Sequence, residues 1–155
     1  METIREILAL KGNQIYSVLP DTTVYYALKI MADQNIGAVV VLEDKKLYGI
    51  MSERDYARKV VLRSKFSKEV LVKEIMSSEI FCIDIDQTIS TTQAIMTQKR
   101  IRHLPVINKG DLVGIISIGD VVNASMDNKT FLIDQLITYI KGMPVIQKEQ
   151  TSEVS

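Results

Sequence analysis

The sequence contains only one cysteine and one histidine. Cys82 has no second cysteine with which to form an internal disulfide, and a single histidine cannot complete a Cys/His zinc site. We therefore expect no metal and no catalytic cofactor. Because a chain without disulfides suits a reducing compartment, we predict a cytoplasmic protein.

An excess of charge of either sign is also missing. The 19 Lys and Arg residues are balanced by 19 Asp and Glu residues. Because duplex nucleic acid is normally bound by a basic excess, we do not expect nucleic acid as a main partner, although a local basic patch stays open.

Long apolar runs are absent as well. The longest, Ala38 to Leu42, is far shorter than the about 20 residues that a membrane-spanning helix needs. The first residues, Met1 to Glu6, carry acids and no long apolar stretch, so we expect neither a targeting signal nor a membrane partner. With 155 residues, 46% of them hydrophobic, the chain is long enough to bury a core of its own.

What the sequence does contain is an internal repeat. Positions 14–59 align without a gap onto positions 79–124 when 65 is added, and 12 of the 46 aligned pairs are identical. Average composition gives roughly three identities by chance. Many other pairs keep their apolar character, so the chain contains two copies of one unit.

Each copy has the pattern of strand, helix, strand, strand and helix. In the first copy, apolar residues recur at helical spacing from Val24 to Met31, and the β-branched run Ala38 to Leu42 predicts a buried strand before a hairpin. One such unit cannot bury both faces of a three-stranded sheet, so we expect the copies to pack sheet against sheet. We predict an α+β, sandwich-like fold of two β-α-β-β-α units with pseudo-twofold symmetry. The predicted strands span 15–18, 38–42, 47–51, 80–85, 103–107 and 112–117, and the helices begin near Val24, Ser52, Thr88 and Ser117.

Short segments flank the two copies. Thr3 and Glu6 form a capping-box pattern that predicts a helix over 3–10, and the apolar spacing over 131–140 predicts an amphipathic helix that Gly142 ends. The polar residues 147–155 are expected to be disordered. The predicted units are 1–13 with the first helix and a linker, 14–65 and 66–125 with the two copies, 126–142 with the last helix, and 143–155 as a tail.

The two copies share a Gly-apolar-apolar-Ser-x-x-Asp motif, at Gly49–Asp55 and Gly114–Asp120. In a structural interpretation, Ser52 and Ser117 are helix N-caps and the aspartates accept backbone hydrogen bonds. In a functional interpretation, the hydroxyl, the free N–H groups and the helix dipole bind phosphate, and the aspartate accepts hydrogen bonds from ribose. Both interpretations use the same geometry.

The doubled motif, with Ile36–Val41 and Ile101–Val106, resembles a tandem pair of CBS domains, the family named for cystathionine β-synthase. The resemblance covers positions 14–124. It implies a β-α-β-β-α fold in each copy and an adenosine-containing ligand, such as AMP, ADP, ATP, NAD or S-adenosylmethionine, between the copies. It also implies a homodimer that pairs through helices. The apolar positions suited to that pairing are Val60, Val61, Val121 and Val122.

The resemblance further implies two clefts. In the first, Asp120 binds ribose and Ser117 binds phosphate, and the residues that hold adenine and close the pocket are Thr22, Ile36, Gly37 and Ala38. In the second, Asp55, Ser52 and Arg54 act together, and the residues opposite are Gln87 or Thr88, Ile101, Arg102 and His103. Arg54 can fork onto a phosphate, which Gly119 at the matching position cannot. The two clefts are therefore expected to differ, and the Asp120 cleft depends more on backbone N–H groups.

Several side chains can be interpreted in two ways. Arg102 and His103 either contact phosphates in the second cleft or partly fill it, and His103 is alternatively a packing residue at a strand edge. Arg54 is alternatively a solvated charge at a helix start. Cys82 is expected to be an inert, buried thiol within a strand. Among the remaining candidates, Met31, Met76 and Met96 are expected to fill the core, Tyr25 and Tyr26 to cover its edge, and the pairs Arg58–Lys59 and Lys99–Arg100 to be solvated or to edge a phosphate-binding cleft.

The two copies take up nearly the whole chain and leave no room for a catalytic domain. We therefore predict a non-enzymatic regulatory and signalling module that binds an adenine nucleotide and modulates an unidentified partner protein. The first alternative is a protein-binding adaptor with empty clefts. The second is a small enzyme that acts on a nucleotide, and it is disfavoured because the sequence shows no Ser-His-acid set, metal cluster or spaced carboxylate pair.

Overall fold

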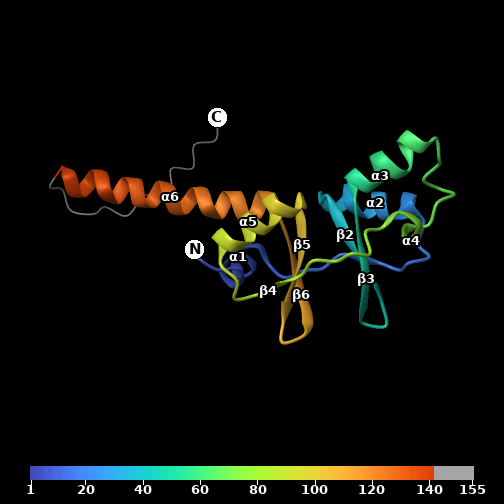
Figure 1. Cartoon of the computed structure of the whole chain (residues 1–155), viewed down its shortest axis with the longest axis horizontal. Coiled ribbons are helices and arrows are strands. Elements are labelled where there is room, and N and C mark those ends of the chain that lie inside the picture. Colours follow the sequence, from blue (N-terminus) through green and yellow to red (C-terminus); the bar gives the residue numbers. More distant parts are fainter. Residues whose placement is uncertain (142–155) are drawn as a thin grey trace.

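The computed structural model describes residues 1–141, apart from the side chain of Tyr139, and the predictions for Gly142 and the tail lie outside these residues. The elements follow the predicted order, with two short helical additions, η1 and α4, between the repeats (Figure 1). They are α1 (Ile4–Lys11), β1 (Ser17–Val18), α2 (Val24–Gln34), β2 (Ala38–Glu43), β3 (Lys46–Ser52), α3 (Glu53–Lys59), the 3-10 turn η1 (Val61–Arg63), α4 (Val72–Ile75), β4 (Ile83–Asp84), α5 (Ile89–Lys99), β5 (His103–Asn108), β6 (Asp111–Ser117) and α6 (Ile118–Ile140).

Each repeat forms its own three-stranded sheet, in the orders β1-β2-β3 and β4-β5-β6. In both sheets the first pair of strands is parallel and the second pair is antiparallel. The registers also correspond, because Val41 lies opposite Gly49 and Val106 lies opposite Gly114, with a register shift at the next residue in each case. The structure therefore confirms the α+β fold and its two β-α-β-β-α units.

The first sheet is buried on both faces. Val39 and Val41 of β2 pack with Met31 of α2 in the core of the first repeat. Ala38 and Val40 point to the opposite face of the strand and are buried as well. That face is turned toward the second sheet, which stands beside the first, while the helices lie on the outer sides (Figure 1). Burial on both faces explains why β2 is an unbroken apolar run in the sequence.

The helices that precede the two repeats are exchanged between them. α1 precedes the first repeat in the sequence but packs in the core of the second, where Ile4 and Leu8 are buried. α4 precedes the second repeat and packs in the core of the first through Val72 and Ile75. Each repeat therefore completes its core with a helix that comes before the other repeat.

Matching contacts fix the two exchanged helices. The N–H group of Ile4 donates to the carbonyl of Gln87 at 3.0 Å, and the N–H group of Val72 donates to that of Thr22 at 2.8 Å. The matching ion pairs, each at 2.8 Å, are Arg5 with Asp86 and Lys73 with Asp21. The exchanged helices are offset by 68 residues and not 65, so a gapless alignment of the repeat does not detect them.

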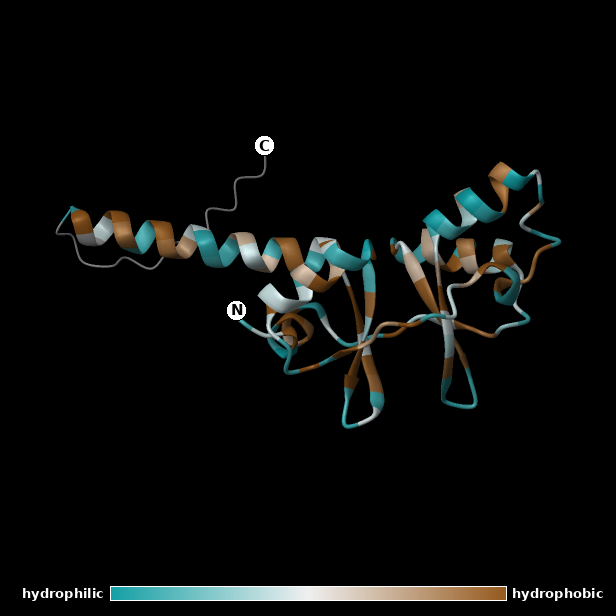
Figure 2. Cartoon of the chain, in the orientation of Figure 1, coloured by the Kyte–Doolittle hydropathy of each residue, from teal (hydrophilic) through white to brown (hydrophobic). Residues whose placement is uncertain are grey.

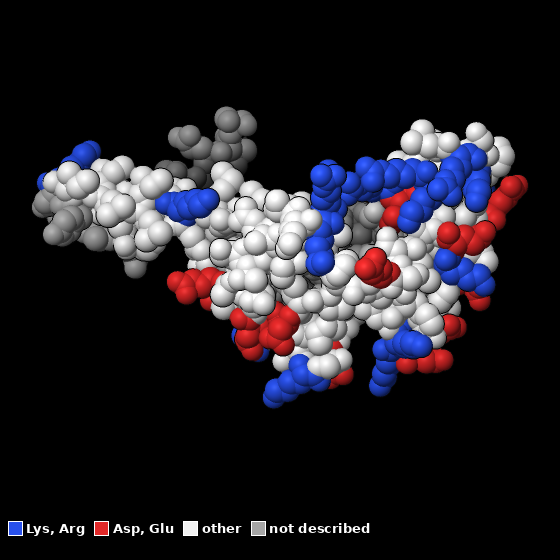
Figure 3. Space-filling view, viewed as in Figure 1, with Lys and Arg blue, Asp and Glu red and all other residues white. Residues whose placement is uncertain are grey.

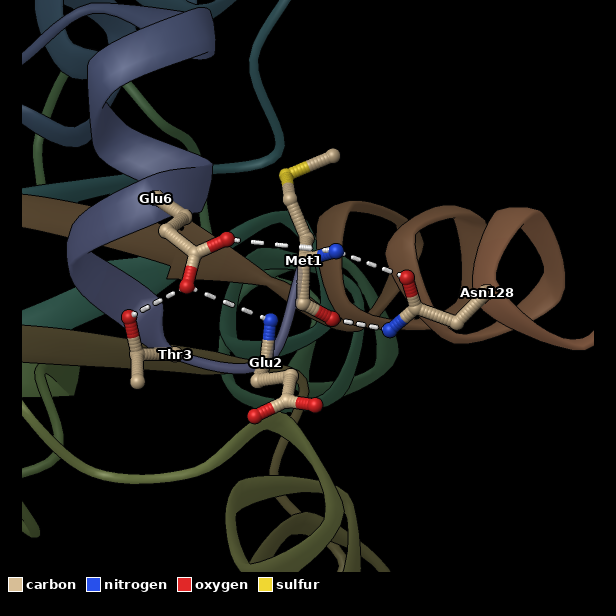
Figure 4. Close-up of polar contacts among 5 residues, drawn as sticks. All are labelled: Met1, Glu2, Thr3, Glu6 and Asn128. Carbon is tan, nitrogen blue, oxygen red and sulfur yellow. Dashed lines mark hydrogen bonds and ion pairs between the residues drawn. The ribbon is translucent and has the colours of Figure 1, made fainter. Parts of the chain in front are cut away.

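α6 is one continuous helix, where the sequence predicted a helix from Ser117 and a separate one over 131–140. The reason is that neither glycine nor proline follows Gly119 before the end of α6, so nothing stops the first helix. The N-terminus of the chain is hydrogen-bonded to α6. The amino group of Met1 donates to Asn128 Oδ1 at 2.7 Å, and the Asn128 side-chain amide donates to the Met1 carbonyl (Figure 4).

The capping box predicted at the start of α1 is not formed, because neither of its two hydrogen bonds is present. The Glu6 carboxylate accepts hydrogen bonds from the Thr3 hydroxyl at 3.3 Å and from the Glu2 N–H group at 3.4 Å (Figure 4). The Thr3 side chain, however, accepts no hydrogen bond from the first turn of the helix. Among residues 1–141, no helix combines the length and the apolar character that crossing a bilayer requires.

Candidate functional site

Both Ser-x-x-Asp motifs cap the helix that follows a hairpin. Asp55 Oδ2 accepts a hydrogen bond from the Ser52 N–H group at 2.9 Å, and Ser52 Oγ accepts one from the Asp55 N–H group at 3.2 Å. Asp120 and Ser117 make the same two contacts at 2.8 and 3.2 Å. The structural interpretation of the motif is therefore confirmed. It leaves the functional interpretation open, because each aspartate also lines a cavity.

Most N–H groups at these helix starts already have protein acceptors. The N–H group of Glu53 donates to the Gly37 carbonyl at 3.1 Å, and that of Ile118 donates to the Arg102 carbonyl at 2.8 Å. With the serine hydroxyls also engaged, one N–H group in the first turn of each helix, that of Arg54 or Gly119, has no acceptor among residues 1–141. Each helix start therefore has fewer N–H groups available to a bound anion than the sequence predicted.

The cavity beside Asp120, here called the Asp120 cleft, has a volume of about 360 Å³. It lies between the two repeats, because the end of β6 and the start of α6 form one wall and the start of β2 forms the other. The predicted residues that line it are Ile36, Gly37, Ala38, Ser117 and Asp120. The further lining residues are Lys11, Gly12, Gln14, Tyr16, Asn35, His103, Ile115 and Ile116.

In this cleft Lys11 forms an ion pair with the carboxylate of Asp120. Its Nζ atom lies 2.7 Å from Asp120 Oδ2 and also donates to the Ile115 carbonyl at 3.0 Å. Burial raises the pKa of Asp120, but the hydrogen bonds from Lys11 and Ser117 outweigh burial and hold the pKa below its ordinary value. The carboxylate is therefore ionised and already paired, so a ribose hydroxyl must share it with Lys11 or displace Lys11.

The cavity beside Asp55, here called the Asp55 cleft, is larger, at about 680 Å³. The predicted residues that line it are Ser52, Arg54, Asp55, Ile101, Arg102 and His103. Its wall contains six Lys and Arg residues and three acidic residues. The cations are Arg54, Arg58, Lys59, Lys99, Arg100 and Arg102, and the acids are Glu53, Asp55 and Glu79. In Figure 3 the cations form a band from the end of α5 to α3, so a local positive field coexists with zero net charge.

Two of these cations are engaged by the protein itself. Lys59 Nζ lies 3.0 Å from Asp55 Oδ1 and donates to the Ile75 carbonyl at 2.8 Å. Arg54 Nη1 donates to the Arg100 carbonyl at 3.2 Å and thus links the two walls of the cleft. The remaining cations, Arg58, Lys99, Arg100 and Arg102, form no ion pair with residues 1–141 and are exposed. Lys99 Nζ lies over the Phe81 ring, 4.3 Å from the ring centroid.

The two clefts occupy matching places in the repeat but have different chemistry. Asn35 lines the Asp120 cleft and Arg100 takes its place in the Asp55 cleft. Both follow the end of a helix and adopt a left-handed backbone, with φ of 53° and 55°. Asparagine is common in this conformation, whereas a longer side chain is disfavoured there by about 1–2 kcal/mol. The Asp55 cleft therefore places an arginine at its edge at a cost to stability.

His103 lies where the two clefts meet and lines both. Its ring packs against Gly37, where an added Cβ atom would lie only 3.2 Å from His103 Nε2. Burial lowers the pKa of His103, and the nearby charges of Lys11 and Arg102 lower it further, while Asp120 acts in the opposite direction. The imidazole is therefore neutral at pH 7 and partly fills the space between the clefts.

Four predicted site residues do not line either cleft. Thr22 Oγ1 accepts a hydrogen bond from the Leu19 N–H group at 3.1 Å, and the Thr22 carbonyl binds α4. Thr88 caps α5 by accepting from the Thr91 N–H group at 3.1 Å. Gly119 lies in the first turn of α6 and is outside the cavity walls, as is Gln87, whose carbonyl binds α1.

The structure also adds residues that the sequence did not assign to a site. Lys11 reaches the Asp120 cleft because α1 packs on the second repeat, and no spacing in the sequence points to that exchange. Tyr16 and Phe81 occupy matching places in the two clefts, which the 65-residue offset could have indicated. The Arg58–Lys59 and Lys99–Arg100 pairs line the Asp55 cleft, and Arg58, Lys99 and Arg100 are also exposed to solvent, so both interpretations of these pairs stay open.

Other expectations need correction. Cys82 is exposed and lies before β4, because that strand is only two residues long; partial burial raises the pKa of its thiol. Val60 and Val121 are buried in the cores of their own repeats, so they are not available for pairing two chains. Tyr25 and Tyr26 are more exposed than expected, whereas the methionines fill the cores as expected, with Met31 and Met96 buried and Met76 packed against the first core.

Comparison with known proteins gives the family. The family model described as "CBS domain" matches twice, over residues 4–62 and 72–127. The mitochondrial "CBS domain-containing protein CBSX3" of Arabidopsis thaliana is 37% identical, with 90% of this chain and 72% of that protein covered. The structure of a "putative signal-transduction protein with CBS domains" from Burkholderia ambifaria has a TM-score of 0.78 and 42% identity, covering 81% of this chain and 94% of that one. A "CBS-domain containing protein", ATU1752 of Agrobacterium tumefaciens, has a TM-score of 0.76 and 35% identity, covering 79% and 98%. The chain therefore belongs to the CBS-domain family and consists of a tandem pair of CBS domains.

Proposed function

We propose that the chain is a regulatory module that binds an adenosine-containing nucleotide in the Asp55 cleft and thereby modulates a partner protein. The observation that carries the proposal is the wall of this cleft, which combines six cations with an aspartate at a helix start. Four of those cations are exposed and form no ion pair among the described residues. A polyanionic ligand would neutralise a charge excess that the protein itself leaves uncompensated.

Each part of such a ligand has a matching group. Asp55 keeps an acceptor for ribose hydroxyls, although Lys59 and Ser52 share its oxygens. Ile80 and Ile101 offer apolar surface for a base, whereas Lys99 already lies over the Phe81 ring. Arg58 and Arg102 are placed for phosphate groups and bring the planar, bidentate geometry that phosphate favours.

The number of free cations favours a polyphosphate over a monophosphate. AMP would engage one or two of them, whereas ATP could engage more at once. At roughly 0.5–1 kcal/mol for each partly exposed contact, two added contacts amount to about tenfold in affinity. We therefore propose ATP or ADP as the preferred ligand, ahead of AMP, NAD and S-adenosylmethionine.

The Asp120 cleft suits a ligand that carries less charge and binds more weakly. Its one lysine is already paired with its one aspartate, and it is about half the size of the other cleft. A nucleoside or a monophosphate is the ligand class that its volume and charge suit.

The second candidate function is that of a protein-binding adaptor with empty clefts. The observation that favours it is the use of both aspartates and most helix-start N–H groups in capping contacts. An enzyme is not favoured, because the hydroxyl that donates to a carboxylate in the Asp55 cleft, that of Ser52 to Asp55 at 3.1 Å, is held in a helix cap.

Isothermal titration of the full chain with ATP, ADP, AMP, NAD and S-adenosylmethionine separates these functions. The module predicts saturable binding, with ATP and ADP tightest and without turnover. The adaptor predicts no binding of any of the five at millimolar concentrations, and conversion of the nucleotide during the titration would indicate an enzyme.

A further inference from the structure

α6 carries an exposed apolar stripe along its whole length. The stripe, here called the α6 seam, advances by four and three residues in alternation: Val122, Met126, Lys129, Ile133, Leu136 and Ile140. Its apolar members beyond Val122 are 60%, 55%, 61% and 80% exposed, in sequence order. Large apolar side chains at such exposure are uncommon in a row on a monomer's surface, so the seam is a candidate interaction surface.

The seam is not the face by which α6 packs on its own domain. That packing uses Val121 and Ala124, which are buried in the second core, and it is confined to the first half of the helix. The second half projects away from the rest of the chain (Figure 1), and Figure 2 shows it as alternating bands of apolar and polar residues. The seam therefore runs from the domain to the end of α6, and Lys129 is its one charged interruption.

The spacing of the seam is that of a coiled coil. Alternating steps of four and three residues place side chains along one line of a slightly underwound helix, where a second helix of the same kind can pack. With Met126, Ile133 and Ile140 at the a positions, Leu136 falls at a d position. Isoleucine at a and leucine at d are the residues that pairs of helices favour.

We propose that the α6 seam pairs with the α6 seam of a second copy of this chain. The positions that flank the seam and select partners in coiled coils carry no charge here. They are Asn123, Ser125, Thr130, Leu132 and Ile137. Since no charged flank rejects an identical helix or selects a different one, the seam is complementary to itself, as a symmetric interface requires.

The area of the seam suits a dimer. Met126, Leu132, Ile133, Leu136, Ile137 and Ile140 are each about half exposed or more. At roughly 100 Å² for each such side chain, they offer on the order of 600 Å² per chain. A specific interface buries about 600–1,000 Å² per partner, so the seam with the flanking Leu132 and Ile137 reaches the lower end of this range.

This inference goes beyond nucleotide binding and does not depend on it, because the seam and the clefts share no residue. Lys129 is the single charged member of the seam. A lysine at such a position lowers the stability of a coiled coil, because its ammonium must bend out to water. The dimer is therefore expected to be reversible at micromolar concentrations.

Sedimentation velocity of the full chain across a concentration series tests the proposal. The wild type is expected to dimerise, and I133E combined with L136E to raise the dissociation constant at least about 100-fold, because two carboxylates would be buried. K129L is expected to tighten the dimer. The matched control is F131E, because Phe131 is 57% exposed on the same helix but lies off the seam; it should leave the dimer intact.

Two outcomes would overturn the proposal. One is a wild type that stays monomeric up to about 100 μM, a concentration at which even a weak interface would associate. The other is a dimer that the I133E/L136E variant leaves unchanged, which would place the contact elsewhere, for example at the exposed Leu62 and Phe66. Circular dichroism and thermal unfolding of each variant verify that the fold is retained.

Discussion

Lys11 and Asp120 form an ion pair with 2.7 Å between Nζ and Oδ2, although they lie 109 positions apart in the chain. The pair exists because α1 crosses over to complete the second repeat. In the first repeat the matching aspartate, Asp55, is instead paired with Lys59, four residues away on its own helix. The same motif therefore has a long-range partner in one cleft and a local one in the other.

K11A should open the Asp120 cleft to an uncharged nucleoside. Asp120 would keep its bonds from Ser117 but lose the cation that a ribose must displace. We expect the affinity for adenosine to rise severalfold, measured by titration calorimetry or by chemical shift changes. The double variant K11A/D120A should lose this gain. An unchanged affinity in K11A would show that Lys11 does not compete with ribose.

G49A should destabilise the fold more than G114A, although the two glycines occupy the same place in the repeat. A Cβ atom at Gly49 would lie 2.8 Å from both Met76 Sδ and the Ser77 carbonyl, and the backbone cannot easily move. At Gly114 it would meet only the flexible end of Leu8, at 3.0 Å. We expect a loss of about 1–3 kcal/mol for G49A and less for G114A, from denaturant unfolding. Equal losses would contradict this account of the two exchanged helices.

R100N should raise the stability of the fold and lower its affinity for ATP. Asparagine tolerates the left-handed backbone at this position, as Asn35 does in the first repeat, so the free energy of unfolding should rise by about 0.5–1 kcal/mol. The affinity for ATP should fall severalfold, because a cation leaves the Asp55 cleft. A fall in both quantities would mean that the Arg100 side chain supports the fold.

His103 should make the protein less stable as the solution is acidified from about pH 7 to pH 5. Its pKa is lowered in the folded state by burial and by Lys11 and Arg102, so the unfolded chain, with an ordinary pKa near 6.5, binds the proton more tightly. Stability is therefore full above the unfolded pKa and is lost as the pH falls toward the folded one. H103Q should flatten this slope. A slope equal to that of the wild type would place its origin in another group.

The repeat fold could be predicted because its signals are local. Alternation of apolar residues, the β-branched run at β2 and the doubled motif are all read within one copy, and the 65-residue offset aligns them. The exchange of α1 and α4 could not be predicted in this way, because their offset of 68 breaks the alignment and the partners Ile4 and Gln87 meet only in the fold. For the same reason Lys11 was missed as a cleft residue.

The candidate site was predicted where residues flank the shared motif and missed where the loops differ. Ser52, Asp55, Ser117 and Asp120 lie in the clefts because the hairpin and the helix that follows it have the same geometry in both copies. Thr22 and Thr88 do not, because the loops that precede α2 and α5 are used to bind the exchanged helices. The continuity of α6 was also missed, since an amphipathic pattern shows which face of a helix is apolar more clearly than it shows where the helix begins.

Titration of ATP into the wild type and into the R58A/R102A variant, at low and at physiological salt, tests the proposed nucleotide site most directly. We predict that the variant binds about tenfold more weakly and depends less on salt, since two phosphate contacts are removed. The matched control K29A removes an exposed lysine of α2 outside both clefts and should bind like the wild type. Equal affinity of R58A/R102A and wild type, or no ATP binding by the wild type at all, would contradict the assignment of the Asp55 cleft as a nucleotide site.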